Sequence, residues 1–201
     1  MLVAGIKSRP VYGGLNIDRH AMRHLFALEG EGALAVLDQV KAVGPDFLKH
    51  ADILYAASGS KDQEHDRKLA ALGADTFWLA PTIPVLLNRL NVMLGQAHMG
   101  AHIHLAGTEG FIGQAQQVAM NHGVDPASLH TEHRGSTARR VQCVHCKGIT
   151  DNVTTSPYAC SACGLSLLVR DHYSRRLGAF QGVCIDAEEP GSAPKPEELF
   201  P

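Results

Sequence analysis

The sequence predicts an α/β fold, a five-stranded doubly wound parallel sheet, followed by a small β-rich domain. Across residues 23–135, short apolar runs typical of buried strands alternate with longer segments whose apolar residues recur at helical spacing. After residue 135 this alternation stops, and four cysteines follow in two closely spaced pairs. We therefore expect an N-terminal arm at residues 1–22, an α/β domain at 23–135, a cysteine-containing domain at 136–185, and an extended acidic, proline-rich tail at 186–201.

The first strand of the α/β domain is expected at residues 23–28, RHLFAL. The turn Gly30-Glu31-Gly32 follows it and leads into an amphipathic helix, ALAVLDQVKAV. A glycine turn at the start of a helix can offer backbone N–H groups to a phosphate, which makes Gly30 and Gly32 candidate cofactor-binding residues. Glu31 adds a negative charge at the same place, so a plain tight turn is the alternative interpretation.

The second strand, at residues 52–57, ends in a polar loop that contains Ser58, Ser60 and Lys61. Hydroxyl groups and an ammonium can hold a phosphate dianion, so these three residues are further candidates for cofactor binding. The alternative is a helix cap, because Ser60 stands at a favourable N-cap position with Gln63 at the capping-box position. The two interpretations are compatible.

The third strand is expected at residues 75–80, and Pro84 then lies in the first turn of a helix that continues to Gln96. This helix has a broad apolar stripe, which we interpret as core packing and not as a cofactor site. The stripe consists of Val85, Leu86, Leu90, Met93 and Leu94.

The last unit of the α/β domain is a complete strand, loop, helix and strand. A strand at residues 101–107 is followed by a glycine-containing loop, a helix at 111–122 and a strand at 128–133, which predicts a right-handed crossover in a parallel sheet. His102 and His104 alternate on one side of the first of these strands, as solvent-facing residues would. The other histidines are scattered, so no second metal site is expected.

The cysteine pattern is the most specific motif in the chain. Cys143 and Cys146 are followed, after thirteen residues, by Cys160 and Cys163. Two C-x₂-C turns can place four thiolates tetrahedrally around one ion, and the β-rich flanks fit a zinc ribbon. Zinc is therefore the expected metal, and rubredoxin-type iron is the alternative. Cys184 lies outside the spacing and is expected to be a buried thiol.

Composition excludes several classes of function. The formal net charge is −2 with a pI near 6.6, which gives no general reason to expect binding to nucleic acid or to a membrane. No apolar run reaches membrane-spanning length, and the N-terminal apolar stretch is too short for a signal peptide. Because the paired cysteines have metal spacing and not the pattern of a disulfide framework, we expect a cytoplasmic protein.

The motif AGTEGF, followed after a helix by LHTEHR, resembles the last βαβ unit of the nicotinamide-binding domain of ferredoxin-NADP reductases. The usual form in that family is C-G-P-x-G-F/M, a helix, and I-H-x-E-x-F. This chain departs from it with Ala106 for the cysteine, Thr108 for the proline and Arg134 for the final aromatic residue. The residues that the resemblance places at the cofactor are Gly107, Thr108, Glu109, Gly110 and Phe111.

The same resemblance gives roles to the two earlier loops. In NADP-dependent members a serine and a basic residue at the end of the second strand hold the adenosine 2′-phosphate, the role implied for Ser58, Ser60 and Lys61. At the first turn the family carries G-G-T-G-x-T-P, where this chain has only the GEG of residues 30–32. The strand end that bears Phe111 faces a flavin domain in those reductases, so here it should face another subunit and display the Phe111 ring.

Over nearly its whole length, and most specifically in the segment RDHYSRR-GAFQGV, the chain resembles the DmmA-like small subunit of bacterial dimethylamine monooxygenase. The resemblance implies a subunit of an NADPH- and O₂-dependent N-demethylating complex. The chain would supply the pyridine-nucleotide domain that delivers hydride to a flavin. Flavin, an iron-sulfur cluster and haem iron would be carried by partner subunits, which agrees with the lack of a flavin motif or a second cysteine set here.

Two other functions remain open at this stage. The chain could be a structural zinc subunit of the same kind of complex with a degenerate nucleotide site, as GEG and Ala106 suggest. It could also be a zinc-ribbon nucleic-acid module, for which arginines 134, 139, 140, 175 and 176 are the only support. We expect no nucleic-acid partner.

Overall fold

The computed structural model describes residues 8–57 and 64–201. These residues form two compact units, one of residues 12–135 and one that combines residues 136–201 with the described N-terminal residues up to Val11. Each unit has its own sheet and its own apolar core. Within the described part of the chain, no helix is both long enough and apolar enough to cross a membrane.

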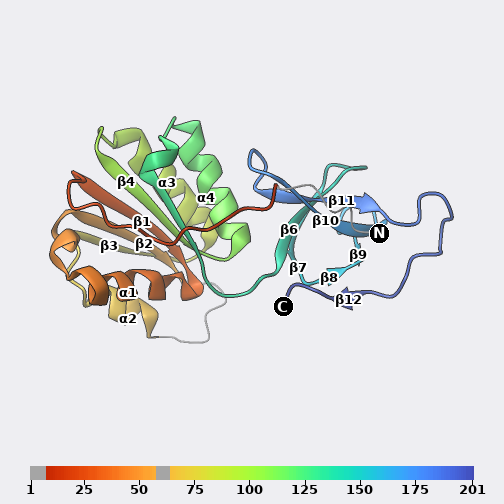
Figure 1. Ribbon diagram of the computed structural model, residues 1–201, viewed down its shortest axis with the longest axis horizontal. Coiled ribbons are helices and arrows are strands. Elements are labelled where there is room, and N and C mark those ends of the chain that lie inside the picture. The colour runs from red at the N-terminus through yellow and green to blue at the C-terminus, as the bar shows by residue number, and fades with distance from the viewer. Residues whose placement is uncertain (1–7, 58–63) are drawn as a thin grey trace. The chain divides into compact units, whose positions relative to one another are not determined.

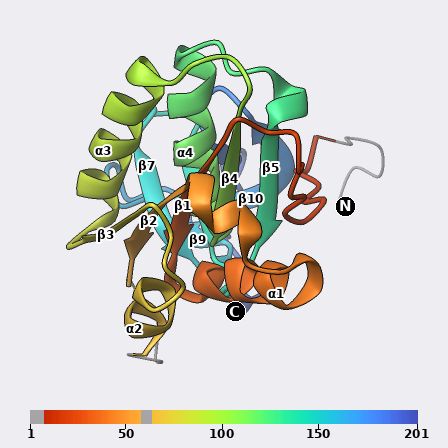
Figure 2. The same ribbon diagram turned by 90° about the vertical axis from the view of Figure 1, so that its left-hand side faces the viewer.

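The first unit confirms the predicted five-stranded parallel sheet. Its strand order is β3-β2-β1-β4-β5, and every pair of neighbouring strands is parallel. Helices α1 and α2 cover one face, and α3 and α4 cover the other (Figures 1 and 2). The elements are β1 (Arg23–Glu29), α1 (Ala33–Val43), β2 (Ala51–Ala56), α2 (His65–Ala70), β3 (Thr76–Ala80), α3 (Ile83–Gln96), β4 (Ala101–Gly107), α4 (Glu109–Asn121) and β5 (Leu129–His133).

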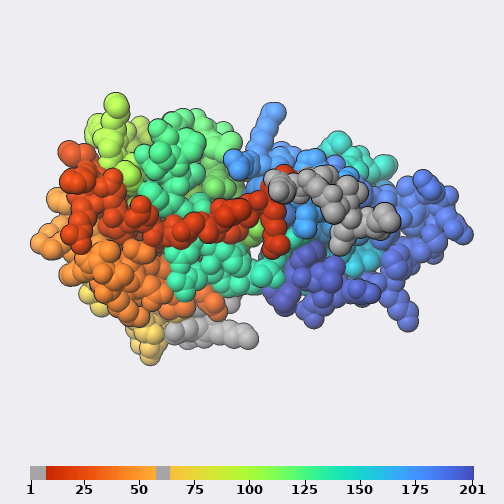
Figure 3. Space-filling model, viewed as in Figure 1, coloured from red at the N-terminus to blue at the C-terminus, as the bar shows by residue number. Residues whose placement is uncertain are grey.

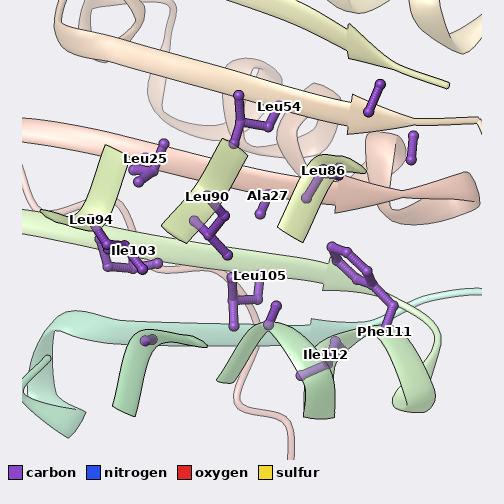
Figure 4. Close-up of a cluster of buried hydrophobic side chains, with 14 residues drawn as sticks. Leu25, Ala27, Leu54, Leu86, Leu90, Leu94, Ile103, Leu105, Phe111 and Ile112 are labelled. Atoms are coloured by element: carbon purple, nitrogen blue, oxygen red, sulfur yellow. The ribbon is translucent and has the colours of Figure 1, made fainter. Parts of the chain in front are cut away.

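An apolar cluster fills the space between the sheet and the helices α3 and α4 (Figure 4). Leu86, Leu90 and Leu94 recur every four residues on α3, so they form one stripe and are all buried against the sheet. The prediction of a core stripe is confirmed for these three residues, and Met93 packs against the cluster. It was wrong for Val85, which lies at the edge of the stripe and is 39% exposed.

Residues 12–22, which precede β1, run along the surface of the first unit (Figure 3). Gly14 forms an isolated bridge with Thr131 of β5, and the Leu15 N–H donates to Oε2 of Glu132 at 2.9 Å. Leu15 and Ile17 are buried in the second cluster, between the sheet and α1. The expected arm is therefore divided: its described residues up to Val11 go with the second unit and the remainder with the sheet.

The second unit is built of short strands. One sheet has the order β7-β6-β11-β10-β9, and β12 pairs with β8 in a separate two-stranded sheet. The strands are β6 (Arg139–Cys143), β7 (Ile149–Val153), β8 (Thr155–Ser156), β9 (Tyr158–Ala159), β10 (Ser166–Ser174), β11 (Ala179–Cys184) and β12 (Glu197–Glu198). The tail folds back on this unit through β12, and the ring of Phe200 lies 4.1 Å from the guanidinium carbon of Arg139.

Candidate metal centre and carboxyl edge of the parallel sheet

Four cysteines of the second unit converge on one point. The sulfur atoms of Cys143, Cys146, Cys160 and Cys163 all lie within 4.8 Å of one another. The Cys143–Cys163 sulfurs are 3.9 Å apart and the Cys146–Cys160 sulfurs 3.7 Å. A tetrahedral ion with metal–sulfur bonds of about 2.3 Å requires sulfur–sulfur distances of about 3.8 Å. The four thiols therefore fit a tetrahedral zinc or iron ion, as their spacing predicts.

Backbone turns shape each half of this centre. The Lys147 N–H donates to the Cys143 carbonyl at 3.0 Å, and the Gly164 N–H donates to the Cys160 carbonyl at 2.9 Å. Gly164 has φ +75°, a conformation that favours glycine. Burial opposes ionisation of Cys160, but hydrogen bonds from the backbone N–H groups of Cys163 and Ala162 and from the thiols of Cys163 and Cys146 outweigh it and lower its pKa to about 7. A metal ion binds the thiolate, and a lowered pKa increases the fraction of the cysteine in that form.

Cys184 does not join the four thiols. Its side chain is half-buried, and its sulfur donates to Oδ1 of Asp186 at 3.3 Å. The hydrogen bond with Asp186 is the first cause, and burial the second, of a raised pKa for this thiol. The sequence-based exclusion of Cys184 from the ligand set agrees with this geometry.

The turn after β1 packs on its own sheet. A Cβ atom on Gly32 would lie 2.1 Å from the carbonyl oxygen of Ala106 in β4, so only glycine allows this contact. Gly30 has φ +52°, and its carbonyl accepts a hydrogen bond from the Tyr55 hydroxyl at 3.2 Å. Gly32 is therefore required by an internal contact, whereas the positive φ of Gly30 favours glycine at that position.

A buried carboxylate lies between this turn and the loop after β4. Glu29 is only 6% exposed, and its Oε2 accepts a hydrogen bond from the Thr108 N–H at 2.9 Å. A Cβ atom on Gly107, whose φ is +150°, would lie 2.8 Å from the same oxygen. Burial raises the pKa of Glu29, while the hydrogen bonds with Thr108 oppose that shift. Sequence reasoning missed Glu29, although an acidic residue at the end of a buried strand was a signal.

The loop after β4 begins α4 as a capped helix. Thr108 Oγ1 accepts from the Phe111 N–H at 3.4 Å, and Glu109, also buried, accepts from the Tyr12 hydroxyl at 3.0 Å. Gly110 lies in the first turn of α4. The expectation that Phe111 is displayed at the surface was wrong. Its ring is 1% exposed and points into the core cluster (Figure 4), because α4 begins two residues earlier and turns that side chain inward.

Arg134, which follows β5, lies at the carboxyl edge of the sheet beside the end of β4. Its N–H donates to the Gly107 carbonyl at 2.9 Å, and its guanidinium pairs with Glu132 and Asp38. The edge thus carries the carboxylates of Glu29 and Glu31, and its arginine is already paired with two acidic groups. At this edge the two glycine turns accommodate contacts within the chain, and the Glu29 carboxylate occupies the Thr108 N–H at the N-terminus of α4. Ser58, Ser60 and Lys61, the candidates for the 2′-phosphate, lie outside the described residues.

Four histidines gather on the α1 face of the sheet. His104 is fully buried, and its ring stacks between Phe26, at 4.4 Å, and His130, at 4.9 Å. The Nδ1 atom of His24 lies 3.0 Å from Nε2 of His104. The Nδ1 atom of His102 likewise lies 3.0 Å from Nε2 of His130. The expectation that His104 faces solvent was wrong, because helices cover both faces of a doubly wound sheet.

Burial disfavours the protonated form of three of these histidines, His24, His104 and His130. Burial lowers the pKa of His24 to about 4 and lowers the pKa of His104 well below its usual value. Burial also lowers the pKa of His130. Among the residues that the structure describes, the four cysteines are the group of three or more ligands close enough to share an ion, so the histidine cluster provides no comparable set.

Comparison with known proteins follows the two units. The family model "Dimethylamine monooxygenase subunit DmmA-like, N-terminal domain" matches residues 4–129, and the model of the corresponding C-terminal domain matches residues 140–183. A protein of Ectopseudomonas mendocina (strain ymp), the "Heme-dependent oxidative N-demethylase delta subunit", is 30% identical over 148 residues, which cover 71% of this chain and 85% of that protein.

Two solved structures are also similar. One is an intact type IV self-sufficient cytochrome P450 monooxygenase, with 20% identity, a TM-score of 0.45, and coverage of 85% of this chain and 27% of the other. The other is the flavohem-like FAD/NAD binding domain of nitric oxide dioxygenase from Vibrio cholerae O1 biovar El Tor, with 19% identity, a TM-score of 0.41, and coverage of 63% of this chain and 56% of the other. The chain spans about a quarter of the first protein and just over half of the second.

Proposed function

The chain belongs to the DmmA-like family of dimethylamine monooxygenase subunits, and from this premise we propose that it is one subunit of a multi-subunit, O₂-dependent oxidative N-demethylase. The designation of the Ectopseudomonas mendocina relative as a delta subunit supports a complex with other chains. In this proposal the substrate is dimethylamine, and the partners are a subunit with flavin and an iron-sulfur cluster and a subunit with haem iron. The subunit itself acts in the cytoplasm.

The geometry best supports a role in assembly for the α/β unit. The observation that carries this role is the hydrogen bond between the Glu29 carboxylate and the Thr108 N–H, at the place where a dinucleotide would meet the sheet. A pyrophosphate there would meet a buried carboxylate, with the carboxylate of Glu31 on the same turn. In this role the carboxyl edge of the unit binds another subunit of the complex, and NADPH binds to a different subunit.

NADPH delivery by this chain is the second candidate, and the order of the strands favours it. Strands β1 and β4 are neighbours although they are not consecutive, and the crevice at such a switch point is where ligands bind in open α/β sheets. Bound NADPH would supply hydride to a flavin on a partner subunit. In this role the loop after β4 orients the nicotinamide, and Ser58, Ser60 and Lys61 hold the 2′-phosphate.

Titration of the isolated chain with NADPH separates the two roles. The assembly role predicts no saturable heat of binding at micromolar to millimolar NADPH in calorimetry, and binding with a micromolar Kd would refute it. Under the delivery role, Glu29→Gln removes a charge at the crevice and should tighten binding more than the same change at the exposed Glu31. Equal effects of the two substitutions would place the nucleotide away from the Glu29 carboxylate.

Reconstitution of the complex gives a second test. Partner subunits are assayed with and without this chain, driven either by NADPH or by an artificial electron donor. Omission of an assembly subunit should lower both activities and the mass of the complex. If omission lowers only the NADPH-driven activity while the complex keeps its other subunits, the chain is the nucleotide domain.

For the metal centre we propose one structural zinc ion bound by the four cysteines of the second unit. The sulfur–sulfur distances of 3.7 and 3.9 Å support a tetrahedral ion, and the four thiols are free and not paired in disulfides. The isolated chain should contain about one zinc per chain by elemental analysis and should be colourless. Stoichiometric iron with a red, rubredoxin-like spectrum would instead support the iron alternative.

A further inference from the structure

A cavity of about 530 Å³ opens at the amino ends of the parallel strands, the opposite end from the glycine turns. Residues at the starts of β1, β2, β3 and β4 and at the end of α3 line it. Its volume falls in the range of small-molecule sites, which is roughly 300–1,000 Å³. Ligands of open α/β sheets normally bind at the carboxyl ends, so this cavity is separate from the crevice considered above.

Three methionines line much of this cavity. Met93 packs against the core cluster, and Leu25, a member of that cluster, also lines the cavity. Met22 and Met99 are 75% and 99% exposed. Unbranched thioether side chains adapt to the shape of an apolar ligand, and exposed ones are free to close over it.

The charges at the cavity leave one cation available. The guanidinium of Arg23 is bound by Asp52 and Asp75, each at 2.6 Å, so these three groups together carry a net charge of −1 and Arg23 is not available to a ligand. Arg89 also lines the cavity, and its guanidinium carbon lies 6.0 Å from the centre of the Trp78 ring. Among the described residues Arg89 forms no ion pair, so it can still bind an anion.

The position of Arg89 on α3 also favours an anion there. Arg89 is seven residues before Gln96, the last residue of α3, which corresponds to about 10 Å along the helix axis. The negative end of the helix dipole acts mainly within the last turn, so it does not cancel this charge. The apolar wall and the guanidinium are therefore two distinct parts of one cavity.

We propose that this cavity binds a small amphipathic anion, with its apolar body against the methionines and Leu25 and its anionic group at Arg89. A fatty acid of medium chain length represents this chemical class. The proposal does not depend on the role of the chain in N-demethylation, because none of the residues at the carboxyl edge contributes to it.

Methyl NMR of the full chain, labelled at the methionine methyl groups, tests the proposal directly. Met22, Met93 and Met99 line the cavity, whereas Met120 lies on α4, is 49% exposed, and serves as a control within the same molecule. Titration with octanoate should shift the three cavity signals in a saturable manner and leave Met120 unchanged. Shifts of the same size at Met120 would mean general surface adsorption and would overturn the proposal.

Charge selectivity is tested with three probes of equal chain length, octanoate, 1-octanol and octylamine. Octanoate should bind about three- to fivefold more tightly than octanol, the effect of one exposed ion pair, and octylamine should bind most weakly. Arg89→Gln should abolish the difference between octanoate and octanol, while Arg67→Gln, an exposed arginine on α2, should leave it unchanged. Octanoate and octanol binding equally to the unmodified chain would refute an anion site at Arg89.

Discussion

Protonation of the buried histidines should make the α/β unit unstable in mild acid, and His24 allows the size of the effect to be worked out. His24 is 2% exposed and has a pKa of about 4 in the folded chain. Burial is the largest cause of this shift; His102 adds to it and Asp18 opposes it. In an unfolded chain a histidine has a pKa of about 6.5, so the unfolded state binds the proton first as the pH falls.

The sign follows from this order of protonation. The stabilisation is fully present above about pH 6.5 and is lost as the pH falls from 6.5 through about 4. For a pKa difference of about 2.5 units, the free energy of unfolding should fall by about 2 kcal/mol between pH 7.5 and pH 5, from His24 alone. His104 and His130 shift in the same direction and should steepen the decline.

Urea unfolding followed by tryptophan fluorescence measures this loss. The chain has a single tryptophan, Trp78, and it lies in β3, so its emission reports the α/β unit and not the cysteine-rich unit. His24→Gln keeps a hydrogen-bonding group toward His104 and should reduce the loss between pH 7.5 and 5 by about 2 kcal/mol. His122→Gln, on an exposed histidine, is the matched control. A decline as steep in the His24 variant as in the unmodified chain would refute the reasoning.

Three further substitutions test the metal centre, the turn and the core. Cys160→Ser should lose most of the bound zinc by elemental analysis, whereas Cys184→Ser should keep it, and equal zinc in both variants would contradict the assigned ligands. Gly32→Ala should destabilise the α/β unit by about 3 kcal/mol in urea unfolding, because its Cβ would lie 2.1 Å from a backbone oxygen; an unchanged midpoint would show that the turn moves freely. Leu90→Ala should lower the free energy of unfolding by about 2–5 kcal/mol. Val92 is 48% exposed, so Val92→Ala should lower it far less, and similar losses in both variants would contradict the assignment of the buried stripe.

The parts of the fold that were predictable from sequence are those set by local spacing. Leu86, Leu90 and Leu94 fall on one face of a helix because four residues make slightly more than one turn, so their burial follows from the sequence alone. The cysteine set was predictable for a similar reason, since a C-x₂-C turn already brings two sulfurs to one ion. Both patterns depend on neighbours a few residues apart.

The sequence-based predictions were wrong where tertiary structure determines whether a side chain is buried. Alternation of His102 and His104 indicates only that they share a face, and whether that face meets water depends on the helices that cover it. In a parallel sheet both faces are covered, so the predicted fold already argued against a solvent-facing His104. Phe111 was misplaced because the start of α4 was expected two residues too late, and in a helix two residues rotate a side chain by more than half a turn.

Glu29 could not have been paired with Thr108 from the sequence, because the two are far apart in the chain and meet only when β1 and β4 become neighbours. This contact offers an explanation for the glycines of the motif that does not involve a ligand. Gly107 is favoured here because its Cβ would lie 2.8 Å from the Glu29 carboxylate, and Gly32 is required because its Cβ would lie 2.1 Å from the Ala106 carbonyl of β4. Glycines in a reductase-like pattern can thus serve contacts within the chain. Glu29 is more informative about this crevice than the glycines, because a glycine can serve internal packing whereas the charged form of a carboxylate repels a phosphate, and burial raises the pKa of Glu29 and so opposes that form.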